Sequence, residues 1–86
     1  MNYEIMWLPV NAEEGMFTGE YAVNFKASNG RVLSLFVDKS LLKEEKNSYF
    51  LKTTLINELS ASVKRILLPS ETLETASPWV DVVCSR

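Results

Sequence analysis

The side chains that most often carry chemistry near neutral pH are missing or isolated in this sequence. Histidine, the usual general base and the commonest metal ligand, does not occur among the 86 residues. The one cysteine, Cys84, has no second thiol for a disulfide within the chain and no histidine for a Cys/His zinc site. We therefore predict no metal site and no cofactor, and we interpret Cys84 as an incidental thiol in a reducing compartment.

Paired carboxylates are the next candidates, because two nearby acids can divide acid and base roles or bind a divalent cation. They occur at Glu13-Glu14, at Glu44-Glu45 and at Glu71 with Glu74. Adjacent residues point in different directions in a strand or a helix. We therefore interpret all of these glutamates as solvated surface.

Nucleophiles and phosphate-binding loops are not indicated either. No serine lies in a Gly-x-Ser-x-Gly elbow, and no histidine is present to activate a hydroxyl. The three glycines, Gly15, Gly19 and Gly30, form neither of the standard nucleotide-binding motifs. The sequence predicts a protein without catalytic residues. An enzyme built on a carboxylate, or on a serine with a lysine, is the least favoured alternative.

The middle of the chain carries most of the positive charge. Residues 39–68 hold six cations against three glutamates, whereas residues 1–38 hold two cations against five acids. Cations with aromatic residues between them can neutralise phosphates and stack the bases of a single strand. The candidate nucleic-acid contacts are Lys39, Lys43, Lys46, Tyr49, Lys52, Lys64 and Arg65. Because the glutamates offset half of this charge, we rank weak single-stranded nucleic-acid binding below protein interaction.

Residues 19–39 show the clearest structural pattern. From Tyr21 to Ala27, apolar residues alternate with more polar ones, which is typical of a strand with one buried face. The pair Asn29-Gly30 follows and favours a two-residue type I′ turn, after which residues 31–38 return as a second strand. We predict a β-hairpin.

The predicted turn also implies a register. With Ser28 opposite Arg31, Val23 lies opposite Phe36 on the core face. The other face then presents an aliphatic stripe that a solvated ribbon does not need, and such stripes often mark protein contacts. The expected interaction site consists of Leu33, Leu35, Val37 and Trp79. Either a second copy covers the hairpin's back face, giving a homodimer, or the chain's own segments cover it.

Two interpretations compete for residues 50–68. Apolar residues from Leu55 to Leu67 recur at the spacing of one helical face, and Pro69 follows as a stop signal, which predicts a helix over 54–68. Alternatively, residues 49–56 are rich in β-forming residues, and 63–68 return as a strand after a turn at 59–62. We favour a mainly β fold, a small curled barrel, SH3-like in shape, of five or six short strands. The alternative is an α+β fold with an antiparallel sheet packed on the helix.

The remaining segments complete a single domain over residues 1–86. Residues 3–10 predict a short strand, 11–15 a turn, 40–47 a helical turn or loop capped by Ser40, 70–77 a polar loop and 78–83 the closing strand. No stretch approaches the roughly 20 apolar residues of a membrane span. We expect a cytoplasmic, non-catalytic protein-interaction or accessory domain whose partner is another protein or a second copy, not a membrane.

Overall fold

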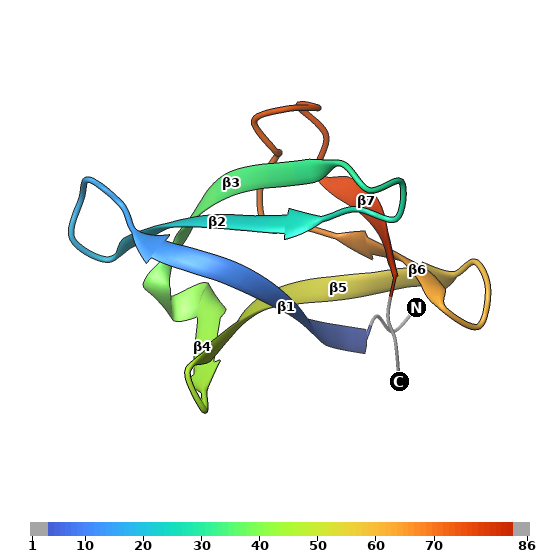
Figure 1. Ribbon diagram of the computed structural model, residues 1–86, viewed down its shortest axis with the longest axis horizontal. Helices are drawn as coiled ribbons and strands as arrows, with labels where there is room; N and C mark the ends of the chain where they lie inside the picture. The colour runs from blue at the N-terminus through green and yellow to red at the C-terminus, as the bar shows by residue number, and fades with distance from the viewer. Residues whose placement is uncertain (1–3, 84–86) are drawn as a thin grey trace.

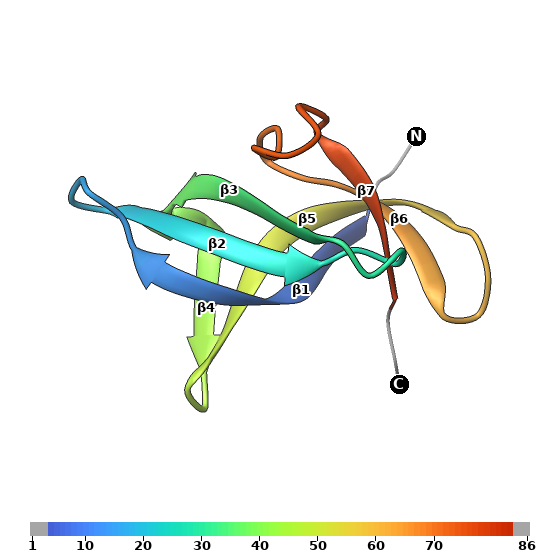
Figure 2. The same cartoon turned by 45° about the horizontal axis from the view of Figure 1, so that its top comes forward.

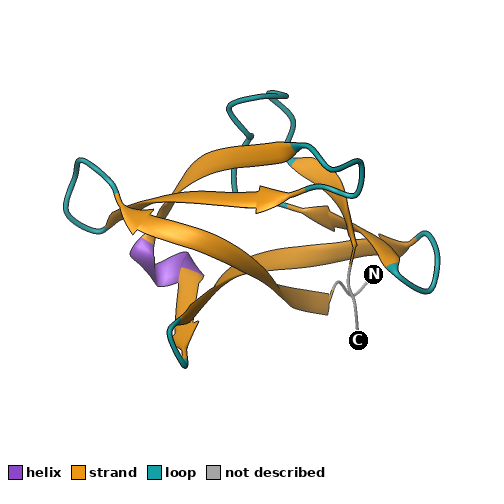
Figure 3. Cartoon of the chain, in the orientation of Figure 1, coloured by secondary structure: helices purple, strands orange, loops and turns teal. Residues whose placement is uncertain are grey.

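Strands are the main secondary structure of the chain (Figure 3). The structure, a computed structural model, describes residues 4–83. The strands are β1 (Glu4–Glu14), β2 (Glu20–Lys26), β3 (Val32–Asp38), β4 (Leu42–Glu45), β5 (Ser48–Glu58), β6 (Val63–Leu67) and β7 (Trp79–Val83), with one 3₁₀ turn, η1 (Lys39–Leu41), before β4. The spatial order is β3-β2-β1-β5-β6-β7, every pairing is antiparallel, and β4 pairs with β5 off this path.

The sheet curls until its two end strands come close (Figure 1, Figure 2). The amide of Ser28, in the β2–β3 turn, donates to the carbonyl of Asp81 in β7 at 2.8 Å. The loop 68–78 also covers the edge of β3, where the amide of Leu73 donates to the carbonyl of Ser34 at 2.8 Å. The predicted mainly β, curled barrel is confirmed as a half-barrel. Residues 42–45 add a short strand to the expected number.

The helix alternative for residues 54–68 is wrong, because these residues form the end of β5, a turn and β6. The amides of Leu59 and Ser60 both donate to the carbonyl of Val63, at 2.9 and 3.1 Å, and close the turn. The register of β5 against β6 shifts between Leu55 and Asn57, which marks a β-bulge. A bulge adds one residue to a strand. Because of this extra residue, the apolar residues before and after the bulge no longer alternate strictly, and their spacing resembles that of a helix.

Two other local predictions need correction. The expected turn at 11–15 belongs largely to β1, because Asn11 pairs with Asn24 of β2 and the strand continues to Glu14. The expected helical turn over 40–47 is limited to η1, and its N-cap is Asp38 instead of Ser40. The Asp38 carboxylate accepts a hydrogen bond from the Ser40 amide at 2.9 Å, and this bond lowers the pKa of Asp38. The closing strand is confirmed as β7.

The β2–β3 hairpin forms as predicted, but its register differs from the prediction by one residue. Val23 lies opposite Leu35 instead of Phe36. The turn is the cause, since the Ala27 amide donates to the carbonyl of Arg31 at 2.8 Å and leaves three residues in the loop. Only the glycine of the Asn-Gly pair has positive φ, 85° at Gly30. This geometry is typical of a three-residue loop that ends in a left-handed glycine, not of a type I′ turn.

The observed register places Val23 of β2 and Leu33, Leu35 and Val37 of β3 on one face, which is the core face. Leu35, at 1% exposure, lies among the most deeply buried side chains. The core consists of Leu8, Val23, Phe25, Ala27, Leu33, Leu35, Val37, Leu51, Ile66, Leu68 and Val82. The expected placement of Leu33, Leu35 and Val37 on a separate back face of the hairpin is therefore wrong. Of the two alternatives for their cover, the chain's own segments bury them.

Candidate binding face

The outer side of the curled sheet carries a row of residues that crosses four strands. Ile5 in β1 lies opposite Thr54 in β5, Thr54 lies opposite Leu67 in β6, and Leu67 lies opposite Trp79 in β7. Ile5, Leu67 and Trp79 remain 56, 40 and 48% exposed. Residues directly opposite in neighbouring strands have Cβ atoms about 5 Å apart. These four side chains therefore form a continuous strip, most of it apolar.

A second pair widens this strip. Trp7 in β1 lies opposite Lys52 in β5, one step along the same side of both strands from Ile5 and Thr54. Both Trp7 and Lys52 are exposed. We call the six residues together the binding face: Ile5, Trp7, Lys52, Thr54, Leu67 and Trp79.

Each tryptophan of the binding face has a cation over its ring. The Lys43 Nζ atom lies 4.9 Å from the ring centroid of Trp7, and the guanidinium carbon of Arg65 lies 4.7 Å from that of Trp79. A cation is attracted to the negative face of an aromatic ring. These contacts restrict both tryptophans and so reduce the conformational entropy that a partner must remove on binding.

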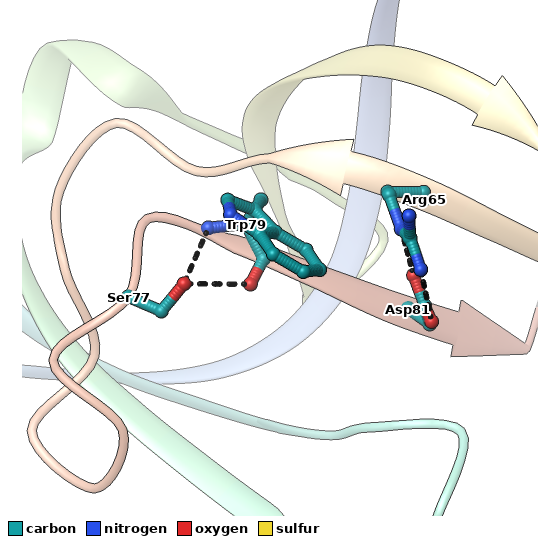
Figure 4. A network of polar contacts seen from close by, with 4 residues as sticks. All are labelled: Arg65, Ser77, Trp79 and Asp81. Carbon is teal, nitrogen blue, oxygen red and sulfur yellow. Dashed lines mark hydrogen bonds and ion pairs between the residues drawn. The ribbon is translucent and has the colours of Figure 1, made fainter.

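An ion pair and a serine hold the second of these clusters (Figure 4). Arg65 and Asp81 lie opposite each other in β6 and β7, and the guanidinium donates to both carboxylate oxygens, at 2.7 and 3.2 Å. Hydrogen bonding within the pair raises the pKa of Arg65 and lowers the pKa of Asp81. The Ser77 hydroxyl accepts from the Trp79 amide at 3.5 Å and donates to the Trp79 carbonyl at 3.4 Å. The start of β7 is thus held by Ser77 at the Trp79 backbone and by the Arg65 ion pair at Asp81.

The structure does not bring the seven predicted nucleic-acid contacts together. Lys43, Lys52 and Arg65 lie on the outer side of the sheet, beside the two tryptophans. Two of these cations are paired with carboxylates, Lys43 with Glu45 at 3.7 Å and Arg65 with Asp81 at 2.7 Å. The positive charge available to a phosphate is therefore small.

The other four predicted contacts lie elsewhere. Tyr49 and Lys64 are half-buried on the inner side of the sheet, opposite Val10 and Val82. Tyr49 packs against Tyr21 with ring centroids 6.0 Å apart, and the charge of Glu44 raises the pKa of Tyr49. Lys39 lies in η1, and Lys46 lies in the turn between β4 and β5.

Trp79 alone among the four predicted interaction residues lies on the binding face. Ile5, Trp7 and Leu67 were not predicted as site residues, because their grouping requires the pairing of β1, β5, β6 and β7. The alternation of residues 3–10 placed Ile5 and Trp7 on one side of a strand. It did not indicate which strand lies beside them.

A hollow opens on the outer side, where the edge of β5 passes from β4 to β6. Its volume is about 370 Å³, and its lining consists of Leu41, Lys52, Thr53, Thr54, Leu67, Leu68 and Pro69. The buried Thr53 hydroxyl donates to the carbonyl of Met6 at 2.6 Å, so this polar group is already satisfied. The hollow is therefore largely apolar, with one cation, Lys52, in its lining.

Neither a metal site nor a membrane-spanning helix is found in the described part of the chain. Within residues 4–83, no group of three or more Asp, Glu, His or Cys side chains is placed to hold a metal ion, and Cys84 lies outside the described residues. The same part of the chain contains no helix long and apolar enough to cross a bilayer.

Comparison with protein-family models, with curated proteins and with solved structures finds no match.

Proposed function

We propose that this chain is a non-catalytic protein-interaction domain that self-associates through the binding face. The supporting observation is the alignment of Ile5, Leu67 and Trp79 across four paired strands, all of them exposed. A contiguous apolar patch marks an interaction site far more often than scattered surface residues do. Tryptophan and arginine, the pair formed by Trp79 and Arg65, are enriched among the residues that dominate binding energy at protein interfaces.

Single-stranded nucleic acid is the second candidate. It is favoured by the placement of Lys43 beside Trp7 and of Arg65 beside Trp79, since bases stack on aromatic rings between cations. Glu45 and Asp81 offset two of these charges on the same side of the sheet. Within residues 4–83, Lys52 is the binding-face cation without an ion pair. This balance of charge favours a protein partner.

Sedimentation equilibrium, from low micromolar to millimolar protein, tests the proposal. We expect the average mass of the wild type to rise with concentration and the Leu67→Lys variant to remain a monomer. The matched control is Phe36→Lys, which places the same charge at an exposed apolar position on the outer side of β3. This control should associate like the wild type. A wild type that stays monomeric, or equal losses in the two variants, would contradict the proposal.

Titration with labelled single-stranded oligonucleotides at low salt separates the two candidates. For a protein-interaction domain, we expect no salt-dependent binding. Binding that weakens as salt rises, and that is lost in Lys52→Gln but kept in Leu67→Lys, would instead assign the binding face to nucleic acid.

A further inference from the structure

The tip of the β1–β2 hairpin displays two apolar side chains on an ordered loop. Met16 is 93% exposed and Phe17 is 70% exposed. The loop projects beyond the curled sheet (Figure 1, Figure 2). Two backbone hydrogen bonds hold it, from the Gly15 amide to the Glu20 carbonyl at 2.7 Å and from the Glu20 amide to the Phe17 carbonyl at 3.0 Å. Because these bonds hold the loop backbone, a partner that binds Met16 and Phe17 has less backbone to order on binding.

Carboxylates surround this tip. Glu13 and Glu14 end β1, while Glu20 begins β2 opposite Asp38 at the end of β3. Lys39 follows Asp38 and offsets one of these four charges. A negative surrounding repels the anionic surface of a membrane. The apolar tip with its surrounding carboxylates is instead complementary to an apolar recess that has a cation at its edge.

The hollow between β4 and β6 has this chemistry. Leu41, Leu67 and Leu68 supply apolar lining, and Lys52 supplies the cation. Its volume, about 370 Å³, lies at the lower end of the roughly 300–1,000 Å³ of binding pockets, which suits one or two side chains. Since Met16 and Phe17 are exposed, the tip does not fill the hollow of its own chain.

We infer that the β1–β2 tip of one copy docks into the hollow of a second copy. Phe17 packs between Leu41 and Leu67 there, and the carboxylates of the tip face Lys52. This inference rests on the proposed function, because Leu67 belongs to both the hollow and the binding face. The contact joins two different surfaces, so the association is head-to-tail and continues beyond a dimer unless a ring closes.

A mixing experiment with two variants tests this arrangement. The tip variant, Met16→Ser with Phe17→Ser, keeps its hollow. The hollow variant, Leu67→Lys, keeps its tip. We expect each variant alone to remain a monomer and their equimolar mixture to form a one-to-one dimer, because each supplies the surface that the other lacks. The wild type should form species larger than a dimer, and Phe36→Lys should behave like the wild type.

Other outcomes overturn the inference in distinguishable ways. If the tip variant associates like the wild type while Leu67→Lys does not, the docking of the tip is wrong and the proposed binding face stands. If both variants are monomers and their mixture is also monomeric, the contact is not head-to-tail. If the wild type never associates, both proposals are wrong. If wild-type protein binds phosphatidylserine vesicles and the tip variant does not, the tip serves a membrane.

Salt dependence gives an independent check on the charges. We expect association to weaken as salt rises, because screening reduces the attraction between the tip carboxylates and Lys52. Lys52→Gln should weaken association at low salt and make it less sensitive to salt. Identical salt dependence in Lys52→Gln and the wild type would contradict the proposed orientation.

Discussion

The carboxylate of Glu74 accepts two hydrogen bonds from Ser34, a residue 40 positions earlier in the chain, from its amide at 2.7 Å and from its hydroxyl at 2.5 Å. Together with the backbone bond from Leu73 to Ser34, these contacts fasten the loop 68–78 to the free edge of β3. The two bonds from Ser34 lower the pKa of Glu74. The contact is therefore complete only while Glu74 is ionised.

The first prediction concerns acid. The pKa of Glu74 is lower in the folded than in the unfolded chain, so its contribution to stability is present above the unfolded pKa and is lost as the pH falls through the folded pKa. We expect the melting temperature of the wild type to decrease once the pH is lower than about 4. Glu74→Gln should melt at a lower temperature near neutral pH, and its melting temperature should decrease less in acid. Part of the decrease should remain, because the pKa values of Asp38 and Asp81 are lowered as well.

Thermal unfolding followed by circular dichroism across this pH range measures the effect. Glu71→Gln is the matched control, because within residues 4–83 the Glu71 side chain forms no hydrogen bond or ion pair. An unchanged acid response in Glu74→Gln would show that the contact with Ser34 does not contribute to the stability of the fold.

The second prediction concerns the hairpin turn. Gly30 has a φ of 85°, a conformation that costs a residue with a Cβ atom about 1–2 kcal/mol. Gly30→Ala should lower the free energy of unfolding by about that amount, measured by urea denaturation. Ser28→Ala is the control, because its backbone bond to Asp81 is preserved. Equal stability of Gly30→Ala and the wild type would contradict the three-residue loop.

The third prediction separates the observed register from the predicted one. Leu35 is buried, whereas its neighbour Phe36 is 48% exposed. Leu35→Ala should destabilise the fold by about 2–5 kcal/mol, the usual cost of such a change in a core. Phe36→Ala should cost less, although it removes more atoms. The reverse order in urea denaturation would favour the register in which Phe36 faces the core.

The fourth prediction concerns the buried hydroxyl of Thr53. Thr53→Val keeps the shape of the side chain but removes the donor to the Met6 carbonyl, and a buried polar group left without its partner costs about 1–3 kcal/mol. Thr53→Ser retains the donor and should lose less stability. If Thr53→Val is as stable as the wild type in urea, the hydrogen bond makes no net contribution to the free energy of unfolding.

Local features of this chain could be predicted because they depend on neighbouring residues. The alternation from Tyr21 to Ala27 and the Asn29-Gly30 pair located the β2–β3 hairpin. The exact pairing across it was wrong, because the same dipeptide serves both two-residue and three-residue loops. The three-residue loop is the one that places Val23 opposite Leu35 on the core face. The burial that favours this pairing depends on the other strands.

Residue types and local spacing were enough to establish that the chain has no histidine for acid–base or metal chemistry. They also predicted the β-strands within residues 19–39 and the position of the closing strand. Contacts between distant segments decide that residues 54–68 form the end of β5, a turn and β6. They also decide that Leu33, Leu35 and Val37 face inward and that Ile5, Leu67 and Trp79 lie in one row. The physical reason is that a side chain's face in a sheet depends on register, bulges and neighbouring strands. These arise from contacts between segments tens of residues apart, which no local pattern contains.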